Sequence, residues 1–274
     1  MINFVIAHHT EAAPLIQHYK LKKLNGKQPF PSFASDNHRL IISGTGKSNS
    51  AAATAWLASF EESYPTKTDG VWVNVGIAGH LDHPVGTLRC ANKITDSTTD
   101  SVWFPVQIKS TISSSHVLTT DKVCHQYQPD CLHEMEASGF YRTALRFSTS
   151  ELAQCLKIVS DNTEHSVDNI DKTQIGDLIS DQLTAIDQYL SFLSELSLET
   201  QAIDTSNAEC VFCKRWKFTA TQERQLQRLL QRYSVLVGDP ETAVSSETYP
   251  ASVKSASQAL DILRGILLRT ESAL

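Results

Sequence analysis

Residues 39–60 read RLIISGTGKSNSAAATAWLASF and contain the three parts of a strand–turn–helix unit. The first five residues are largely apolar and predict a buried strand, and the alanine-rich run at the end predicts a helix. Gly44 and Gly46 between them predict a tight turn. A mononucleotide P-loop needs an earlier glycine at position 41, where Ile41 stands, so GKS does not indicate such a loop. The turn either brings backbone close to a ligand or packs the helix on a sheet.

Strand and helix patterns alternate on both sides of this unit. Short apolar runs that stop at polar or glycine residues predict strands, and apolar residues three to four positions apart predict helices. Strands are predicted at 2–7, 39–43, 71–75, 88–94, 106–112 and 156–159, and helices from Glu11 onward and at 48–60, 136–147 and 175–198. This alternation predicts an α/β fold with a mixed or mostly parallel sheet.

The pattern changes near residue 199. Residues 199–209 are polar and predict a linker. Two helices, each with one apolar face, are predicted beyond it at 221–237 and 252–268. We therefore expect a core domain over 1–198 and an α-helical extension over 199–274.

The composition is that of a globular protein and excludes several classes. Of 274 residues, 41% are apolar and 20% charged, which argues against wholesale disorder. The net charge of −6 argues against a molecule that binds polyanions as a whole. The chain contains no run of 18 apolar residues and opens with no basic segment, so we expect no membrane span, no signal peptide and a cytoplasmic location.

The cysteines are expected to be free thiols, as is usual in the cytosol. Cys210 and Cys213 have the spacing of a zinc-ligand pair, but a zinc site needs two more ligands. Those ligands would have to come from Cys124, His125, Cys131 and His133. The alternative is a buried or partly buried thiol pair. We expect no metal and no cofactor.

Two acidic residues follow predicted strands, and a third opens a predicted helix. Glu11 follows the first strand, Glu136 lies in the segment HEMEA, and Asp161 follows the strand LKIV. Ligands of open α/β sheets collect at the carboxyl ends of the strands, where Gly76–Gly79 also lies. Each acid also has a structural role as the alternative to a ligand contact. Glu11 would be a solvated glutamate in the first turn of a helix, Glu136 a partner for the helix dipole, and Asp161 an N-cap.

The segments in chain order are more specific than any one of them. HHTEAAPL (8–15), SGTGKSNSAAAT (43–54), NVGIAGHLD (74–82) followed by VGTL, HEMEA (133–137) and KIVSDN (157–162) resemble the motifs of the nucleoside phosphorylase and nucleosidase superfamily. That superfamily includes purine and uridine phosphorylases and methylthioadenosine/adenosylhomocysteine nucleosidases. The resemblance covers about residues 1–198. It implies a three-layer phosphorylase-like fold with a central mixed, twisted sheet flanked by helices, a nucleoside as small-molecule partner, and a homodimer.

The resemblance also implies catalytic roles. Asp161 would hydrogen-bond the purine N7 and protonate the leaving base, and Ser160 would position that acid. Glu11 matches the glutamate that activates water in the nucleosidases. These residue types suit the reaction, because breaking an N-ribosidic bond leaves positive charge on the sugar and negative charge on the base.

Substrate-binding roles follow in the same way. Glu136 would hold the ribose 2′- and 3′-hydroxyls, and Met135 would line the sugar. The floor beneath the nucleophile would be formed by Gly76, Ile77, Ala78 and Gly79. The family's base-stacking aromatic has no clear counterpart: His116 or Val117 stands near its position, and Trp103 or Phe104 is an alternative.

Two departures from the family concern the nucleophile. Ile77 replaces the serine or threonine that helps bind phosphate, and the first loop, AHHTE, contains no arginine. Both favour water over phosphate, so the leading hypothesis is a nucleosidase-type hydrolase. The alternatives are a phosphate-dependent phosphorylase and, because Ile77 and His80 depart from the family, a catalytically weak protein that binds a nucleoside or a partner.

The extension contains a basic stripe. Arg224, Arg228 and Arg232 repeat every four residues and share one helix face. Aromatic residues lie among the cations before it, at Phe212, Trp216 and Phe218. This composition is compatible with single-stranded nucleic acid, but the prediction that we favour is a solvated helix face with aromatic packing, and no nucleic-acid partner.

Overall fold

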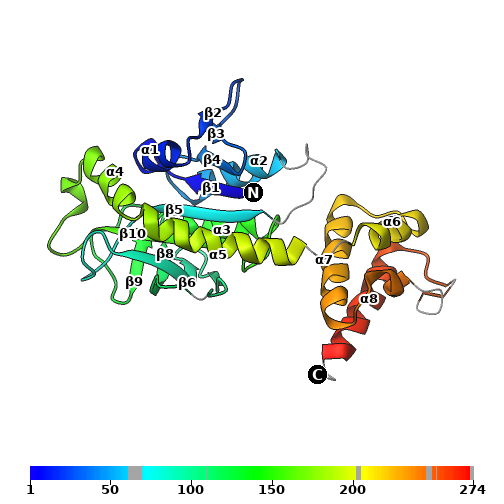
Figure 1. The fold of residues 1–274 in the computed structure, drawn as a ribbon. Coiled ribbons are helices and arrows are strands. Elements are labelled where there is room, and N and C mark those ends of the chain that lie inside the picture. Colours follow the sequence, from blue (N-terminus) through cyan, green and yellow to red (C-terminus); the bar gives the residue numbers. More distant parts are fainter. Residues whose placement is uncertain (61–69, 109, 202–204, 245–248, 251, 272–274) are drawn as a thin grey trace. The chain divides into compact units, whose positions relative to one another are not determined.

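The computed structural model describes residues 1–274 except 61–69, 109, 202–204, 245–248, 251 and 272–274. The chain divides into two compact units, Met1–Leu198 and Glu199–Leu274. Strands and helices alternate in the first unit, whereas the second unit is helical in its described part (Figure 1).

The first unit is built on a mixed sheet. Its strands are β1 (Ile2–Ile6), β2 (Lys22–Lys23), β3 (Ser32–Ala34), β4 (His38–Ile42), β5 (Val71–Gly79), β6 (Leu88–Asp96), β7 (Val102–Trp103), β8 (Ser114–Thr119), β9 (Cys131–Glu134) and β10 (Ala153–Asp161). The order is β10-β6-β8-β9-β5-β1-β4-β3-β2, with β7 on β6. Because β10 also pairs with β5, the strands β5, β10, β6, β8 and β9 close on themselves.

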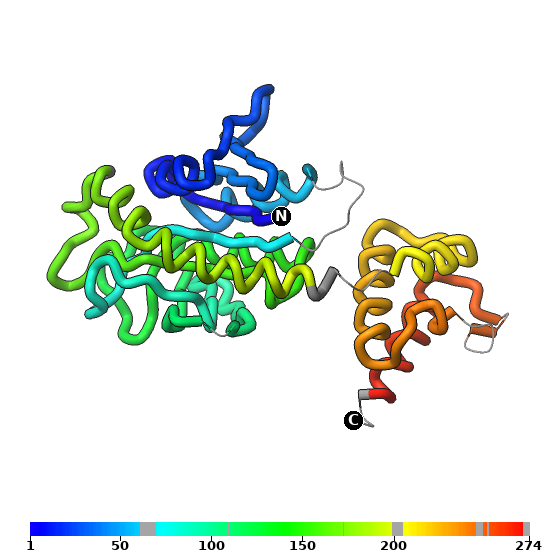
Figure 2. Tube along the Cα trace, in the orientation of Figure 1, coloured from blue at the N-terminus to red at the C-terminus, as the bar shows by residue number. Residues whose placement is uncertain are grey.

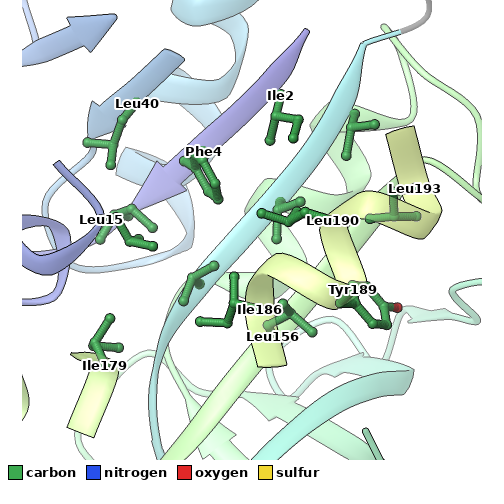
Figure 3. Packing of buried hydrophobic residues seen from close by; sticks show 14 of the residues in the cluster. Ile2, Phe4, Leu15, Leu40, Leu156, Ile179, Ile186, Tyr189, Leu190 and Leu193 are labelled. Atoms are coloured by element: carbon green, nitrogen blue, oxygen red, sulfur yellow. The ribbon is translucent and has the colours of Figure 1, made fainter. Parts of the chain in front are cut away.

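Helices cover both faces of the sheet and give the three predicted layers. One face carries α1 (His9–His18), α4 (Lys172–Asp181) and α5 (Leu183–Gln201), and the other carries α2 (Lys47–Ser59) and α3 (Ala137–Ala144). Figure 3 shows the first of these interfaces, where Leu15 of α1 and Ile186 and Leu190 of α5 point toward the strands. The predicted α/β class with a central mixed sheet is confirmed.

The two central strands explain where polar side chains gather. β10 is buried along its whole length, and β5 is buried except for the half-buried Ile77. The two strands run parallel, and Asp161 at the end of β10 pairs with Gly79 at the end of β5. A strand buried on both faces has no solvent side, so polar residues on it face one another or a ligand.

The second unit has its own apolar core. Its helices are α6 (Ser206–Arg215), α7 (Ala220–Leu236) and α8 (Ala256–Glu271). Phe212 and Trp216 are buried in this core and Phe218 packs against it, so these rings are not displayed for stacking on nucleic-acid bases. The three arginines of the basic stripe, Arg224, Arg228 and Arg232, are exposed on α7.

Four predicted segments need correction. The described residues of 106–112 form no strand, because the Gln107 amide bonds the carbonyls of Ala91 and Pro105 while Ile108 and Ile112 anchor the segment to the core. The next strand is β8. The helix predicted at 136–147 is shorter, since Glu136 is its N-cap.

The single helix predicted at 175–198 is two helices, which Figure 2 follows from α4 into α5. Gln182 ends α4, and its side-chain amide donates to the Gly86 carbonyl. The predicted linker is also wrong in its described part. α5 extends to Gln201 and α6 begins at Ser206, and residues 202–204 between them lie outside the described part.

All six cysteines are free thiols. Cys210 and Cys213 are exposed, which corrects the prediction of a buried or partly buried pair. Within the described residues, no group of three or more His, Cys, Asp or Glu could hold a metal ion. None of the helices in the described part of the chain has the length and apolar character that a membrane crossing needs.

Candidate active site

Three buried acids lie at the carboxyl ends of β1, β5, β9 and β10. Glu11 enters from the first turn of α1, Glu136 caps α3, and Asp161 ends β10. All three are buried, and Glu11 and Glu136 are close enough to interact electrostatically. The fold therefore brings Glu11 and Glu136 close together although they are far apart in the sequence, and it places Asp161 opposite Gly79 at the end of β5.

Glu11 is held by backbone amides on both carboxylate oxygens. The amide of His8 donates to Oε2 (2.8 Å), and the amide of Ile77 donates to Oε1 (2.9 Å). The second bond ties the first turn of α1 to the end of β5. A Cβ at Gly76 would lie 2.9 Å from Glu11 Oε1, so only glycine lets the carboxylate come this close.

The two acids of HEMEA have different partners. Glu134 Oε2 accepts from the amides of Glu136 (2.9 Å) and Ala137 (2.8 Å) and from Lys157 Nζ (2.8 Å), and its Oε1 accepts from Thr119 (2.6 Å). Glu134 thus satisfies the first turn of α3, as the helix-dipole alternative requires. The helix-dipole role therefore belongs to Glu134, and the Glu136 carboxylate is not needed for it.

Among the residues that the structure describes, the Glu136 carboxylate accepts hydrogen bonds from backbone amides. The amide of Gly46 donates to its Oε1 (2.8 Å), and the amide of Met135 approaches Oε2 (3.3 Å). Burial, together with the charge of Glu134, raises the pKa of Glu136 to about 7 against a partial offset from Lys157. The Gly44–Gly46 turn brings a backbone amide close to this carboxylate, and both alternatives for the turn, a ligand contact or helix packing, stay open.

Lys157 is a site residue that the sequence analysis missed. Its ammonium pairs with Glu134, and both side chains are only 1% exposed. A Cβ at Gly76 would lie 3.5 Å from Lys157 Nζ, so this cation stands beside Glu11 as well. Burial alone would lower the pKa of Lys157, but Glu134 and Glu136 raise it above its usual value. A lysine inside the apolar run LKIV is the signal that could have identified it.

Asp161 accepts a hydrogen bond on each carboxylate oxygen. Ser160 donates its hydroxyl to Oδ1, and Tyr127 donates its hydroxyl to Oδ2. A Cβ at Gly79 would collide with Asp161 Oδ2 and with the Tyr127 ring, so Gly79 makes room for both. Tyr127 lies in the connection between β8 and β9 and was not predicted.

The remaining predicted residues are distributed over the floor and a neighbouring cleft. Gly76, Ile77, Ala78 and Gly79 form the end of β5 beneath Glu11 and Asp161, and Met135 is half-buried beside Glu136.

His116 lies on β8, where its Nε2 bonds Thr95 Oγ1 (2.9 Å). It lines a cleft of about 610 Å³ with His80, Lys93 and Phe104, among others. The motif resemblance grouped His116 with the base subsite, and that assignment stays a prediction.

No protein-family model and no curated protein sequence matches this chain. Solved structures resemble it at low sequence identity. The 5′-methylthioadenosine nucleosidase of Arabidopsis thaliana in apo form is 15% identical, with a TM-score of 0.57, over 70% of this chain and 95% of that one. The 5′-methylthioadenosine/S-adenosylhomocysteine nucleosidase of Campylobacter jejuni is 16% identical, with a TM-score of 0.51, over 68% and 96%.

The corresponding enzyme of Neisseria meningitidis, in complex with methylthio-immucillin-A, is 18% identical, with a TM-score of 0.50, over 65% and 96%. These structures cover a share of the chain close in size to the first unit. The fold that the motif resemblance implies is therefore confirmed: the chain has the fold of the methylthioadenosine/adenosylhomocysteine nucleosidases.

Proposed function

We propose that the protein cleaves the N-ribosidic bond of a purine nucleoside or a related ribosyl compound, with water as the nucleophile. One observation supports the proposal: three buried acids with three different sets of partners lie at or just beyond the carboxyl ends of strands that neighbour one another in a nucleosidase-like sheet. Buried acids cost stability unless they are compensated, and their clustering in one place marks a functional site.

Asp161 is proposed as the acid that protonates the leaving base. It ends a buried strand, and Ser160 fixes its Oδ1, so a base nitrogen would have to meet Oδ2, which accepts from the Tyr127 hydroxyl in the structure. When the bond between C1′ and the base nitrogen breaks, its electron pair goes to the base. A proton from Asp161 neutralises that charge and makes the base a better leaving group.

Glu136 is proposed to bind the ribose. Its carboxylate can accept two hydrogen bonds from vicinal hydroxyls, and Gly46 holds it in place. In its ionised form it would also stabilise the positive charge that develops on the sugar. Glu134, whose Oε2 accepts from Lys157 and the α3 amides and whose Oε1 accepts from Thr119, serves as its support.

Glu11 is proposed as the general base. Water attacks C1′, Glu11 takes a proton from that water, and the products are the free base and the free sugar. The pocket disfavours phosphate as the nucleophile. A phosphate dianion would meet the buried carboxylates of Glu11, Glu134 and Glu136, and the Lys157 ammonium is already paired. Arg142, on the last turn of α3, is exposed.

The test is a panel of purine nucleosides incubated with and without inorganic phosphate, with analysis of both products. We expect free base and free sugar in equal amounts, with no need for phosphate. Glu11→Gln should lower turnover by about 10²- to 10⁴-fold, since the amide cannot accept the proton. Glu164→Gln, at an exposed acid beyond β10, is the matched control.

Two outcomes would contradict the proposal in different ways. Sugar 1-phosphate formed only in the presence of phosphate would establish a phosphorylase. Nucleoside binding without any base release, in the wild type as in Glu11→Gln, would establish a binding protein with a nucleosidase fold.

A further inference from the structure

Tyr127 is bound to the proposed acid, and the reaction outlined above does not use it. Its hydroxyl donates to Asp161 Oδ2, while Ser160 donates to Oδ1. Both oxygens of the acid are thus occupied by hydroxyl groups of the protein itself. A leaving base that is to be protonated by Asp161 has to take the place of one of them.

The ring of Tyr127 also fills the space that a base needs. It lies over Gly79, where a Cβ would be 2.9 Å from the ring's Cζ. A nucleobase and a tyrosine side chain are both flat rings with a hydrogen-bonding group. Either one could lie over a glycine, here Gly79, and bond the carboxylate beside it. His133, which pairs with Gly79 in the sheet, also lies beside Tyr127, with its ring centroid 5.5 Å from that of Tyr127.

The connection that bears Tyr127, residues 120–130, is held at several points. At its start, Asp121 pairs with Lys47 Nζ (2.9 Å) and accepts from Thr98 Oγ1 (2.6 Å). Directly after Tyr127, the amide of Gln128 donates to His133 Nε2 (3.1 Å). These bonds hold the backbone on both sides of Tyr127, so its side chain can leave Asp161 while the connection stays in place.

The phenol stays a hydrogen-bond donor. Burial first, and then the hydrogen bond to Asp161, raise the pKa of Tyr127 above its usual value, so it remains protonated. It therefore competes for Asp161 as a neutral donor.

We propose that Tyr127 is a gate on the base subsite: it occupies the space over Gly79 and bonds the oxygen of Asp161 that Ser160 does not bond, and a planar nitrogen heterocycle enters by displacing it. This inference rests on the proposed function, because it takes Asp161 as the residue that meets the base. The gate makes binding selective. Displacing Tyr127 breaks its contact with Gly79 and its hydrogen bond to Asp161, and only a ring that restores both interactions offsets that loss.

The experiment compares Tyr127→Phe with Tyr19→Phe. The first substitution removes the hydroxyl that competes for Asp161 and keeps a ring. The second removes a similar bond, from the Tyr19 hydroxyl to Asp187 Oδ1 (2.6 Å), between α1 and α5. We expect Tyr127→Phe to lower KM by about tenfold, the worth of one hydrogen bond to a charged group. Tyr19→Phe should keep the wild-type KM.

A second measurement reports on the gate without catalysis. The protein has seven tyrosines. In protein made with 3-fluorotyrosine, the ¹⁹F resonance that is missing from Tyr127→Phe belongs to Tyr127. We expect that resonance to shift when free adenine or hypoxanthine is titrated into wild-type protein, and the resonance that Tyr19→Phe identifies to stay in place.

The outcomes separate the gate from the proposed function. Two results would overturn the gate alone. One is nucleoside cleavage with a Tyr127 resonance that does not move at saturating base. The other is a Tyr127→Phe variant with lower kcat and unchanged KM, because that pattern identifies Tyr127 as a residue that positions Asp161. Absence of both binding and cleavage, in wild type and Tyr127→Phe across the panel, would overturn the proposed function and the gate with it.

Discussion

The interiors of the two units differ in what they bury. In the first unit, charged side chains lie at the centre, among them Glu11, Glu134, Glu136, Lys157 and Asp161. In the described part of the second unit, the core is made of apolar and aromatic side chains. Burying charge is costly and needs dedicated partners, whereas an apolar core stabilises a fold without them. The difference favours the first unit as the place of the proposed chemistry, whereas the apolar interior of the second unit stabilises its fold.

The largest effect is expected from the acid itself. Asp161→Asn keeps the shape of the side chain and can still accept from Ser160, but it cannot supply a proton. We expect the rate of base release to fall by about 10²- to 10⁴-fold. The thermal unfolding midpoint should stay close to that of the wild type, since the amide replaces the carboxylate in place. Measuring kcat and the unfolding midpoint on the same samples separates the two properties.

Turnover like that of the wild type in Asp161→Asn would remove the argument that the buried charges of the first unit serve catalysis. They would then be structural in the same sense as the core of the second unit.

The sequence revealed some of these residues for a simple reason. Asp161 and Glu136 directly follow buried strands, and a strand that is apolar throughout fixes where its carboxyl end lies. Backbone pairing then determines the neighbours, as Gly79 and Asp161 illustrate. Local sequence alone left an N-cap or a helix-dipole partner as the alternative for these acids, and the prediction that they face a ligand came from the motif resemblance.

Other residues depend on contacts that local sequence does not encode. Lys157 reaches Glu134 only because β10 passes beside β5 and under α3, and Tyr127 reaches Asp161 only through the path of the 120–130 connection. The strand predicted at 106–112 fails for a related reason. Its apolar residues pack on the core as an irregular segment, which the same hydrophobicity allows.

The next effect is on stability and compares one buried residue from each unit. Lys157→Met leaves Glu134 buried without its cation, and the expected loss is about 3–5 kcal/mol of unfolding free energy. Leu230→Ala, in the core of the second unit, creates a cavity and should cost about 2–5 kcal/mol. The two variants are expected to be similarly unstable and to differ in activity.

Urea unfolding and nucleoside turnover, both measured at a temperature where each variant is folded, distinguish them. Lys157→Met should lose base release, because Glu11 and Glu136 lose the cation between them. Leu230→Ala should retain it. Equal losses of turnover in both variants would contradict the expectation that the buried charges of the first unit, unlike the apolar core of the second, serve turnover.

The smallest effect is a dependence on pH. The pKa of Glu136 is raised to about 7, mainly by burial and then by Glu134. An ionised carboxylate accepts both ribose hydroxyls better than a protonated one, so KM for a riboside should fall as pH rises through about 7. Stability should move the other way. A raised acid pKa favours the folded state below the unfolded value of 4.5, and this contribution is lost as pH rises through about 7.

Glu136→Gln tests both signs in one variant, because the amide does not titrate. Its KM and its unfolding midpoint should lose the component that changes near pH 7 in the wild type. It should also discriminate less between ribosides and 2′-deoxyribosides, since a carboxylate acceptor for both hydroxyls is gone. Wild-type protein that is indifferent to the 2′-hydroxyl, or whose KM rises through pH 7, would show that this buried acid does not hold the sugar. The charge at the centre of the first unit would then have to act on another part of the substrate.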